Sequence, residues 1–290
     1  DPPELSEFNY SHRTILEDQS LTGMSLTYMD VDSPLSSLTA TISADNKELL
    51  PDGSMSVILS NGRADVSVIP AKDRWGTATV TLTISDGQDS SSRFFRLTVE
   101  PVNDPPSFVK GPDQTVEEDA PPQRVARWAT DITPGPYEDH QQLRFEVDVL
   151  SGAELFAEGP EVTADGTLIY TPAPDKFGTA EVEIWLVDDG GTANGGEDTS
   201  PRQKFFINIL PVNDPPVIAP IPPIGTEIGQ MSDEILITVT DVDSDVSRVV
   251  LTVHSENPSL VPNDAEHIIV TPAGPGQWKL RLKPVDGKIG

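Results

Sequence analysis

The sequence predicts an all-β fold, in which Greek-key β-sandwich units follow one another in a linear rod. Three observations lead to this prediction. The peptide Val-Asn-Asp-Pro-Pro occurs at residues 102–106 and again at 212–216, and Asp-Pro-Pro opens the chain. Short runs of alternating apolar and polar residues, rich in Val, Ile and Thr, lie between these peptides, and such alternation is typical of half-buried strands. No stretch carries the apolar period of an amphipathic helix.

The clearest predicted strands come shortly before the repeated peptides. Residues 79–84 read Thr-Val-Thr-Leu-Thr-Ile, and residues 95–99 read Phe-Arg-Leu-Thr-Val. Residues 181–186 and 205–209 alternate in the same way one repeat later. Each pair of strands is followed by an acidic peptide that two prolines stiffen. A strand, a stiff joint and another copy of the same unit are typical of a linear domain array.

Other segments also repeat, and they fix the unit boundaries. Pro-Ala-Lys-Asp-Arg-Trp-Gly at 70–76 returns as Pro-Ala-Pro-Asp-Lys-Phe-Gly at 172–178, and Glu-Asp at 17–18 returns at 118–119. A joint of so few residues leaves no path back, so the two termini of each unit must lie at opposite ends. The alignment predicts units of residues 1–104, 105–214 and 215–290, with joint one at 101–106 and joint two at 211–216.

The third unit is expected to be incomplete. Its segment 284–290 aligns with 70–76 and 172–178, and the last two strands of a complete unit have no counterpart in residues 215–290. We therefore expect this fragment to fold stably only where further strands, from a longer chain or from a neighbouring molecule, complete the sheet. The apolar side chains that would lose part of their cover are Ile235, Ile237, Leu251 and Val253.

The charge of the chain narrows the range of partners. Its 290 residues include 47 acidic and 19 basic side chains, which gives a formal net charge of −28. Nucleic acid and anionic membranes repel such a chain, whereas divalent cations are attracted. The sequence has no Cys, so disulfides, thiolate metal sites and cysteine catalysis are excluded. No apolar run approaches the roughly 18 residues of a membrane helix, and no signal peptide opens the sequence.

Each joint pairs an amide with a carboxylate, and both are hard oxygen ligands of the kind that Ca²⁺ takes. Further carboxylates recur at corresponding places in the units. Carboxylates crowded at one joint repel one another in the absence of a cation, so a bound cation would turn a hinge into a rigid joint. The motifs are Asn103-Asp104 and Asn213-Asp214 in the joints, Asp30-Val-Asp32 and Asp241-Val-Asp243, and the Asp-Gly pairs at 86–87 and 189–190.

Together these motifs resemble the cadherin-like tandem repeats of large extracellular proteins, especially the bacterial type. The segment Pro101-Val-Asn-Asp-Pro-Pro-Ser-Phe108 is similar to the cadherin joint Asp-x-Asn-Asp-Asn-Ala-Pro-x-Phe, although it lacks the first Asp and is one residue shorter. In that family Ca²⁺ lies between consecutive domains. The resemblance implies a site at joint one from Glu17, Asp73, Asn103 and Asp104 of the first unit and Asp131 and Asp188 of the second. It implies a site at joint two from Glu118, Asp175, Asn213, Asp214, Asp241 and Asp243.

Joint one departs from the family pattern, so we expect it to be the weaker site. Asp131 is followed by Ile132 and Thr133, where the pattern has Asp-x-Asp, and one carboxylate is therefore missing. Joint two keeps both carboxylates of that motif. The acids of the first unit that have no preceding unit to face, Asp30, Asp32 and Asp86, are expected to form half a site.

The resemblance implies a mechanical role outside the cell. No nucleophile elbow, phosphate loop or dinucleotide fingerprint occurs, and we expect a non-enzymatic extracellular or cell-surface segment that serves spacing or adhesion. The expected partners are Ca²⁺ and other copies of the chain or neighbouring domains, and nucleic acid is not among them. Two alternatives remain: a filament subunit whose third unit is completed by a strand of its neighbour, and a carbohydrate-binding module that contacts surface glycans.

The aromatic residues bear on these alternatives. Trp185 lies out of phase with the inward residues of its strand, so we expect it to point outward, either covered by a neighbouring loop or in contact with a partner. Trp75, Phe177 and Ile289 share one repeat position. Because that position accepts any large apolar side chain, we expect all three in the core.

Overall fold

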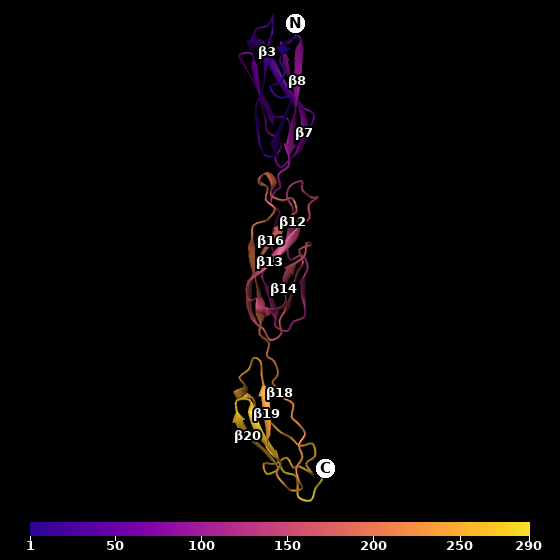
Figure 1. Ribbon diagram of the computed structural model, residues 1–290, viewed down its shortest axis with the longest axis vertical. Coiled ribbons are helices and arrows are strands. Elements are labelled where there is room, and N and C mark those ends of the chain that lie inside the picture. The colour runs from indigo at the N-terminus through magenta and orange to yellow at the C-terminus, as the bar shows by residue number, and fades with distance from the viewer.

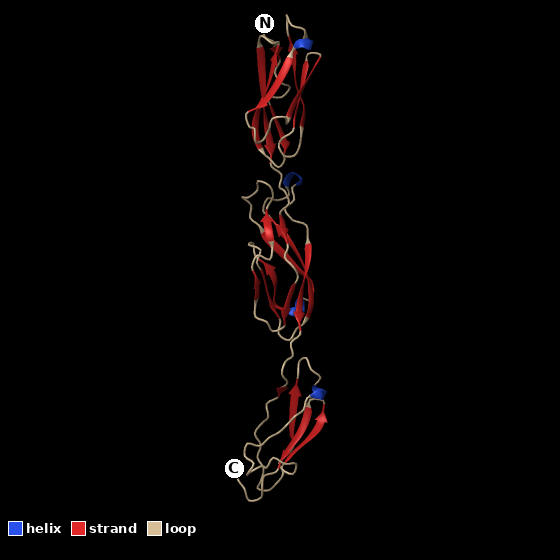
Figure 2. Ribbon diagram, turned by 180° about the vertical axis from the view of Figure 1, so that it is seen from behind, coloured by secondary structure: helices blue, strands red, loops and turns tan.

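The computed structural model describes residues 1–290 as an elongated rod (Figure 1). Three units follow one another along the long axis, and a single segment of chain crosses from each unit to the next (Figures 1 and 2). Strands dominate the secondary structure. The only helices are four single 3-10 turns, at Leu35–Ser37, Ala153–Leu155, Ala193–Gly195 and Val246–Arg248. The predicted all-β array of tandem units is confirmed.

Unit one is a sandwich of two four-stranded sheets, with the strand orders β1-β3-β6-β5 and β2-β8-β7-β4. Twenty buried residues fill the space between the sheets. Alternate side chains of β7 and β8, which contain the predicted strands 79–84 and 95–99, point into this core. The strands are β1 (Glu4–Leu5), β2 (His12–Leu16), β3 (Leu21–Met29), β4 (Thr39–Ala44), β5 (Met55–Ser60), β6 (Arg63–Val68), β7 (Gly76–Ser85) and β8 (Ser90–Glu100).

Unit two repeats this plan with a larger share of irregular chain. Its main sheet has the order β10-β17-β16-β13, a three-stranded sheet has the order β11-β15-β14, and β12 pairs with β9. The strand β10 runs parallel to β17, as β2 does to β8 in unit one. Fourteen buried residues form the core. The strands are β9 (Ser107–Val109), β10 (Gln114–Glu117), β11 (Gln123–Val125), β12 (Thr130–Thr133), β13 (Arg144–Ser151), β14 (Phe156–Val162), β15 (Leu168–Pro172), β16 (Gly178–Val187) and β17 (Gln203–Leu210).

Unit three has one four-stranded sheet, β18-β19-β21-β20, made of β18 (Val217–Ile218), β19 (Ile235–Thr240), β20 (Ile268–Gly274) and β21 (Gln277–Leu282). Only four residues form its buried core. The expected loss of cover is found at Leu251 and Val253, which are half-buried. It is wrong for Ile235 and Ile237, which are 7% and 2% exposed, because the irregular segment that holds Leu251 and Val253 packs against the sheet.

A pair of aspartates closes the C-terminal end of units one and two in the same way. Asp18 Oδ1 accepts a hydrogen bond of 3.0 Å from the backbone N of Asp73, and Asp119 Oδ1 accepts one of 3.1 Å from that of Asp175. All four residues adopt left-handed backbone conformations, with φ between 54° and 60°, which Asp tolerates better than most side chains. The Glu-Asp pair and the turn at 70–76 or 172–178 are therefore held together beside each joint.

The turn also corrects the prediction for the shared aromatic position. Trp75 is 49% exposed, Phe177 54% and Ile289 82%, so none of them lies in a core. Trp75 and Phe177 follow the left-handed aspartates by two residues and lie at the joint end of their units. The repeat thus conserves the turn and its place beside the joint, and not the burial of the side chain.

Trp185 lies on the outer face of β16, as predicted. Its indole ring is half-buried, because the guanidinium of Arg202 lies 3.8 Å from the ring centroid. Arg202 is held in turn by a 2.8 Å ion pair with Glu183. The cover therefore comes from a cation–π contact with a neighbouring side chain.

Candidate metal sites at the two joints

Joint two gathers carboxylates from both sides of the linker. Asp119, Asp175 and Asp214 each offer an oxygen, and these three oxygens lie within 4.8 Å of one another. Glu118 is 4% exposed, and its Oε1 accepts a 2.8 Å hydrogen bond from the backbone N of Val212, which fixes it against the linker. One Ca²⁺ ion with oxygens at about 2.3–2.6 Å fits between groups at this separation.

The third unit completes joint two with its Asp-x-Asp loop. Asp243 Oδ2 accepts a 2.8 Å hydrogen bond from the backbone N of Asp214, and Asp241 Oδ1 accepts one of 2.8 Å from that of Ser244. The Ser244 hydroxyl lies 3.4 Å from Asn213 Oδ1. The structure therefore brings together all six residues assigned to joint two, together with Asp119. The repeated Glu-Asp pair had marked Asp119 in the sequence, but only its glutamate was assigned.

The carboxylates at joint two take part in no ion pair, although Arg248 lines the same cleft. Loss of solvent raises the pKa of Asp214, and the negative charges of Asp119, Asp175, Asp243 and Glu118 raise it further. Its Oδ2 atom is buried without a hydrogen-bond partner. A carboxylate with a raised pKa destabilises the metal-free joint at neutral pH, and this cost is relieved as the pH falls through that pKa or when a cation binds.

On the unit-one side of joint one, a glutamate is fixed against the linker in the same way as at joint two. Glu17 Oε1 accepts a hydrogen bond from the backbone N of Val102, as Glu118 does from Val212. On the other side, both carboxylate oxygens of Glu138 lie 3.3–3.4 Å from the backbone N of Asp104. Glu138 is 7% exposed. A loop of unit two, residues 134–142, carries this glutamate to the linker.

Asn103 is the most tightly held residue of joint one. Its Nδ2 donates to Asp188 Oδ1 at 3.0 Å and to the carbonyl of Glu197 at 2.7 Å, and its Oδ1 accepts from Gln141 Nε2 at 2.6 Å. The backbone N of Glu197 donates to the Asn103 carbonyl at 3.0 Å. The glycine-rich segment 188–197 thus wraps the linker. Asp188 is 3% exposed, and its Oδ2 is buried without a partner.

The electrostatics of joint one follow those of joint two, with one difference. Burial raises the pKa of Glu17, Asp104 and Glu138, and neighbouring carboxylates raise all three further. Lys72 lies 3.1 Å from Asp73 and partly offsets this effect at Asp104. The repeat has Pro174 in the place of Lys72. At joint two the basic side chain comes from unit three instead, where Arg248 lines the cleft together with Asp214 and Asp243.

One residue assigned to joint one does not belong to this group. Asp131 is exposed, has a left-handed φ of 51° and lies where the register of β12 shifts against β9. It is not among the main causes of the raised pKa values of Glu17, Asp104 and Glu138. Glu138 takes its place beside Asp104. The loop that carries Glu138 is longer than the corresponding loop of unit one, which runs from Asp30 to Leu38, so the repeat alignment gave no signal for this glutamate.

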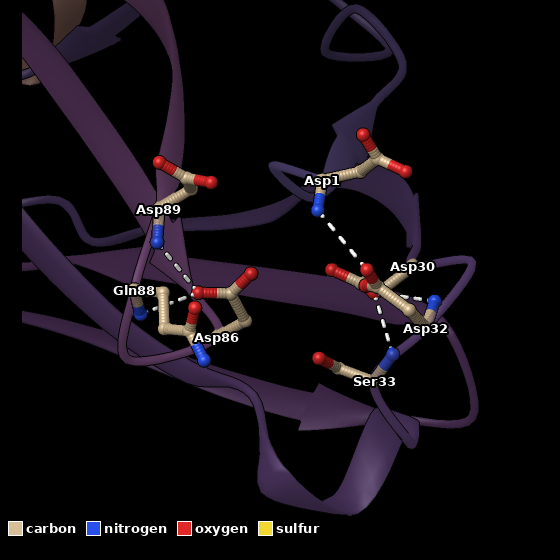
Figure 3. A network of polar contacts seen from close by, with 7 residues as sticks. All are labelled: Asp1, Asp30, Asp32, Ser33, Asp86, Gln88 and Asp89. Carbon is tan, nitrogen blue, oxygen red and sulfur yellow. Dashed lines mark hydrogen bonds and ion pairs between the residues drawn. The ribbon is translucent and has the colours of Figure 1, made fainter.

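A third acidic group lies at the far end of unit one (Figure 3). Carboxylate oxygens of Asp30, Asp32 and Asp86 lie within 4.8 Å of one another. Asp30 Oδ1 accepts from the backbone N of Ser33 at 2.7 Å, much as Asp241 accepts from Ser244 at joint two. The amine of Asp1 lies 3.1 Å from Asp32 Oδ2. These are the residues that we expected to form half a site.

Comparisons with known proteins found one family model and several similar structures. Residues 1–98 match the family model of the bacterial Ig domain, and no curated protein sequence matches the chain. Among solved structures, the chain is similar to human protocadherin-24 EC1-2, with 20% identity over 72% of this chain and 98% of that chain and a TM-score of 0.46. It is also similar to the extracellular cadherin domains 1-5 of protocadherin gamma B2, with 16% identity over 98% of this chain and 53% of that chain and a TM-score of 0.41. An I-band fragment of titin shows 14% identity over 99% of this chain and 90% of that chain, with a TM-score of 0.34.

The predicted tandem β architecture is confirmed. The first unit matches the bacterial Ig domain, and the same two-sheet plan with a parallel strand pair recurs in unit two. The structure contains no helix of the length and apolar character that would cross a membrane. The chain is therefore a tandem array of β-sheet units, the first of which matches the bacterial Ig domain.

Proposed function

We propose that this array is a non-enzymatic, extracellular structural or adhesion segment whose two joints bind Ca²⁺ and become stiff when they do. The observation that carries the proposal is the convergence of Asp119, Asp175 and Asp214 at joint two, where Asp214 keeps a buried carboxylate oxygen without a partner. We place the unit boundaries at residues 104 and 214, so that each site lies between two units.

The donor set suits a hard divalent cation. Every candidate ligand is a carboxylate or an amide oxygen, and the chain has no Cys, so softer metals that prefer thiolates are disfavoured. When bound, Ca²⁺ would supply positive charge that offsets the crowded carboxylates of both joints. The residues that would hold it at joint two are Glu118, Asp119, Asp175, Asn213, Asp214, Asp241 and Asp243. Those at joint one are Glu17, Asp18, Asp73, Asn103, Asp104, Glu138 and Asp188.

A bound cation would stiffen each joint because its ligands come from both of the units that meet there. At each joint the preceding unit supplies a Glu-Asp pair and a turn aspartate, and the following unit supplies at least one further acid. A cation that bonds to both groups at once fixes the angle between the units. An array of this kind holds its ends apart, which is the work of a spacer or an adhesive stalk.

A carbohydrate-binding role has less support in the structure. The aromatic residue that favoured it, Trp185, has its ring under the Arg202 guanidinium. The adhesion proposal therefore includes neighbouring domains and other copies of the chain as partners and does not depend on glycans.

Calorimetric titration with Ca²⁺, combined with native mass spectrometry, tests the proposal. We expect at least one ion at each joint and two classes of affinity, with joint two the tighter, because it keeps both carboxylates of the Asp-x-Asp motif and joint one does not. Asp104→Asn should remove the weaker class, which assigns it. Absence of bound Ca²⁺ would contradict the proposal, and a tighter first joint would contradict the ranking.

A further inference from the structure

The bodies of units one and two touch directly across joint one. The guanidinium carbon of Arg74 lies 3.6 Å from the centroid of the Tyr137 ring. Arg74 belongs to the turn 70–76 of unit one, where it also lies 3.8 Å from Glu48, and Tyr137 belongs to the loop 134–142 of unit two. The other two cation–π contacts of the chain, Arg13 with Tyr10 and Arg202 with Trp185, join residues of a single unit.

The backbone of Tyr137 is strained in the conformation that makes this contact. Its φ is 61°, a left-handed conformation that is unfavourable for a bulky side chain. Strain of this kind persists where the surroundings impose it. Here it directs the ring onto Arg74, one residue before Glu138 reaches Asp104.

The contact continues along a cleft of about 250 Å³ between the two units. Trp75 and Pro101 line it from unit one, and residues of unit two, among them Glu138, His140 and Ala193, line the other side. The half-exposed Trp75 therefore faces the second unit. Together with the four hydrogen bonds on Asn103, these contacts join the units without any cation.

Joint two lacks such a contact. The repeat counterparts of Arg74 and Trp75 are Lys176 and Phe177, and Lys176 takes part in no ion pair or cation–π contact. The cleft at joint two is lined by linker residues, such as Asn213 and Pro216, and by unit three. No residue from the body of unit two contributes to it. What joins the linker to unit three there is two hydrogen bonds, from the Asp214 backbone N to Asp243 and from the Ser244 hydroxyl to Asn213, among carboxylates that repel one another.

We propose that joint one is locked by direct contact between its units, with Arg74 and Tyr137 as positioning residues, and that joint two is the hinge of the rod. Without a divalent cation, the rod bends at joint two while joint one keeps its orientation. The second half of this inference rests on the proposed function, and the first half does not.

Double electron–electron resonance tests each joint separately, because the chain has no Cys and introduced cysteines are the only labelling sites. The pair Thr41→Cys and Asp148→Cys spans joint one, and the pair Asp148→Cys and Thr271→Cys spans joint two; all three positions are exposed. On addition of chelator we expect the distance distribution across joint two to broaden and that across joint one to stay narrow.

Tyr137→Ala should make joint one broaden in chelator, with a rise in the bent population of about two- to fivefold, the factor that corresponds to about 0.5–1 kcal/mol for an exposed cation–π contact. Tyr137 is 53% exposed, so the change removes no core contact. Arg74→Ala should give the same result. The matched control is Tyr10→Ala, which removes a cation–π contact within unit one and should leave both distributions unchanged.

Two results would overturn the inference: equal broadening of both joints of the unmodified chain in chelator, or no effect of Tyr137→Ala and Arg74→Ala on joint one. Failure of the proposed function gives a different pattern. If Ca²⁺ does not bind, chelator changes neither joint, and joint two is broad throughout. Joint one is then still expected to be narrow and to broaden when Tyr137 is replaced.

Discussion

Asp214→Asn is expected to lower the affinity of joint two for Ca²⁺ by at least about tenfold while leaving joint one unchanged. Two unit charges about 4 Å apart interact by about 4 kcal/mol at the effective dielectric of a protein surface, so one lost carboxylate outweighs the roughly 1.4 kcal/mol that a tenfold change requires. Asparagine keeps the shape and one oxygen of the side chain. The measurement is calorimetric titration of the variant beside the unmodified chain.

In the absence of metal, Asp214→Asn should instead stabilise the folded chain. Burial and four neighbouring carboxylates raise the pKa of Asp214, so its charge destabilises the folded state at neutral pH, and its removal should raise the melting temperature in chelator. In excess Ca²⁺ the variant should melt below the unmodified chain. The matched control is Asp148→Asn, which replaces an exposed acid on the outer face of β13. It should change the melting temperature neither in chelator nor in Ca²⁺. A variant that binds Ca²⁺ normally would show that Asp214 is not a ligand.

Gly190→Ala is expected to disrupt joint one. A Cβ atom at this position would overlap Asn103 Oδ1 and approach Gln141 Nε2, although the backbone φ of Gly190 is not left-handed. Glycine is therefore required by the close approach of the linker. The variant must move Asn103, and it loses hydrogen bonds whose buried partners cost about 1–3 kcal/mol each when left unpaired.

The readout for Gly190→Ala is the melting transition of unit two together with hydrogen exchange of the Glu197 amide, which donates to the Asn103 carbonyl and should lose protection. Gly159→Ala provides the control, since a Cβ there meets no atom within 4 Å and the φ of Gly159 is not left-handed. Equal protection of the Glu197 amide in both variants would mean that segment 188–197 does not hold the linker as the structure describes.

Much of the fold could be predicted from the sequence because the repeats are long and their signals are local. The alternation in residues 79–84 and 95–99 follows directly from the two faces of a strand. The six residues assigned to joint two could be proposed because every motif there is complete. The Asn103 position was also visible, but its partners Gln141 and Glu197 depend on how two irregular loops fold, and both loops are longer than the corresponding loops of unit one.

The wrong predictions have the same cause. Trp75 and Phe177 were expected in the core because a repeat position with variable apolar residues is usually buried. In the structure this position follows a left-handed aspartate at the end of the unit, and tertiary placement outweighs residue type. Asp131 was expected at joint one by alignment alone, whereas Glu138 reaches Asp104 from a loop that is longer in unit two than in unit one. Segments that differ between the units thus decide the chemistry that distinguishes joint one from joint two.

Small-angle X-ray scattering of the whole chain, in Ca²⁺ and then in chelator, tests the stiffening of the joints by Ca²⁺ most directly. We predict an extended, rigid particle in Ca²⁺, with a maximum dimension that matches the rod of Figure 1. In chelator the average dimension should shorten and the scattering should take on the character of flexibly linked units, while circular dichroism shows that the strands remain folded. Identical scattering curves in both conditions, with no metal detected in the protein, would contradict the account.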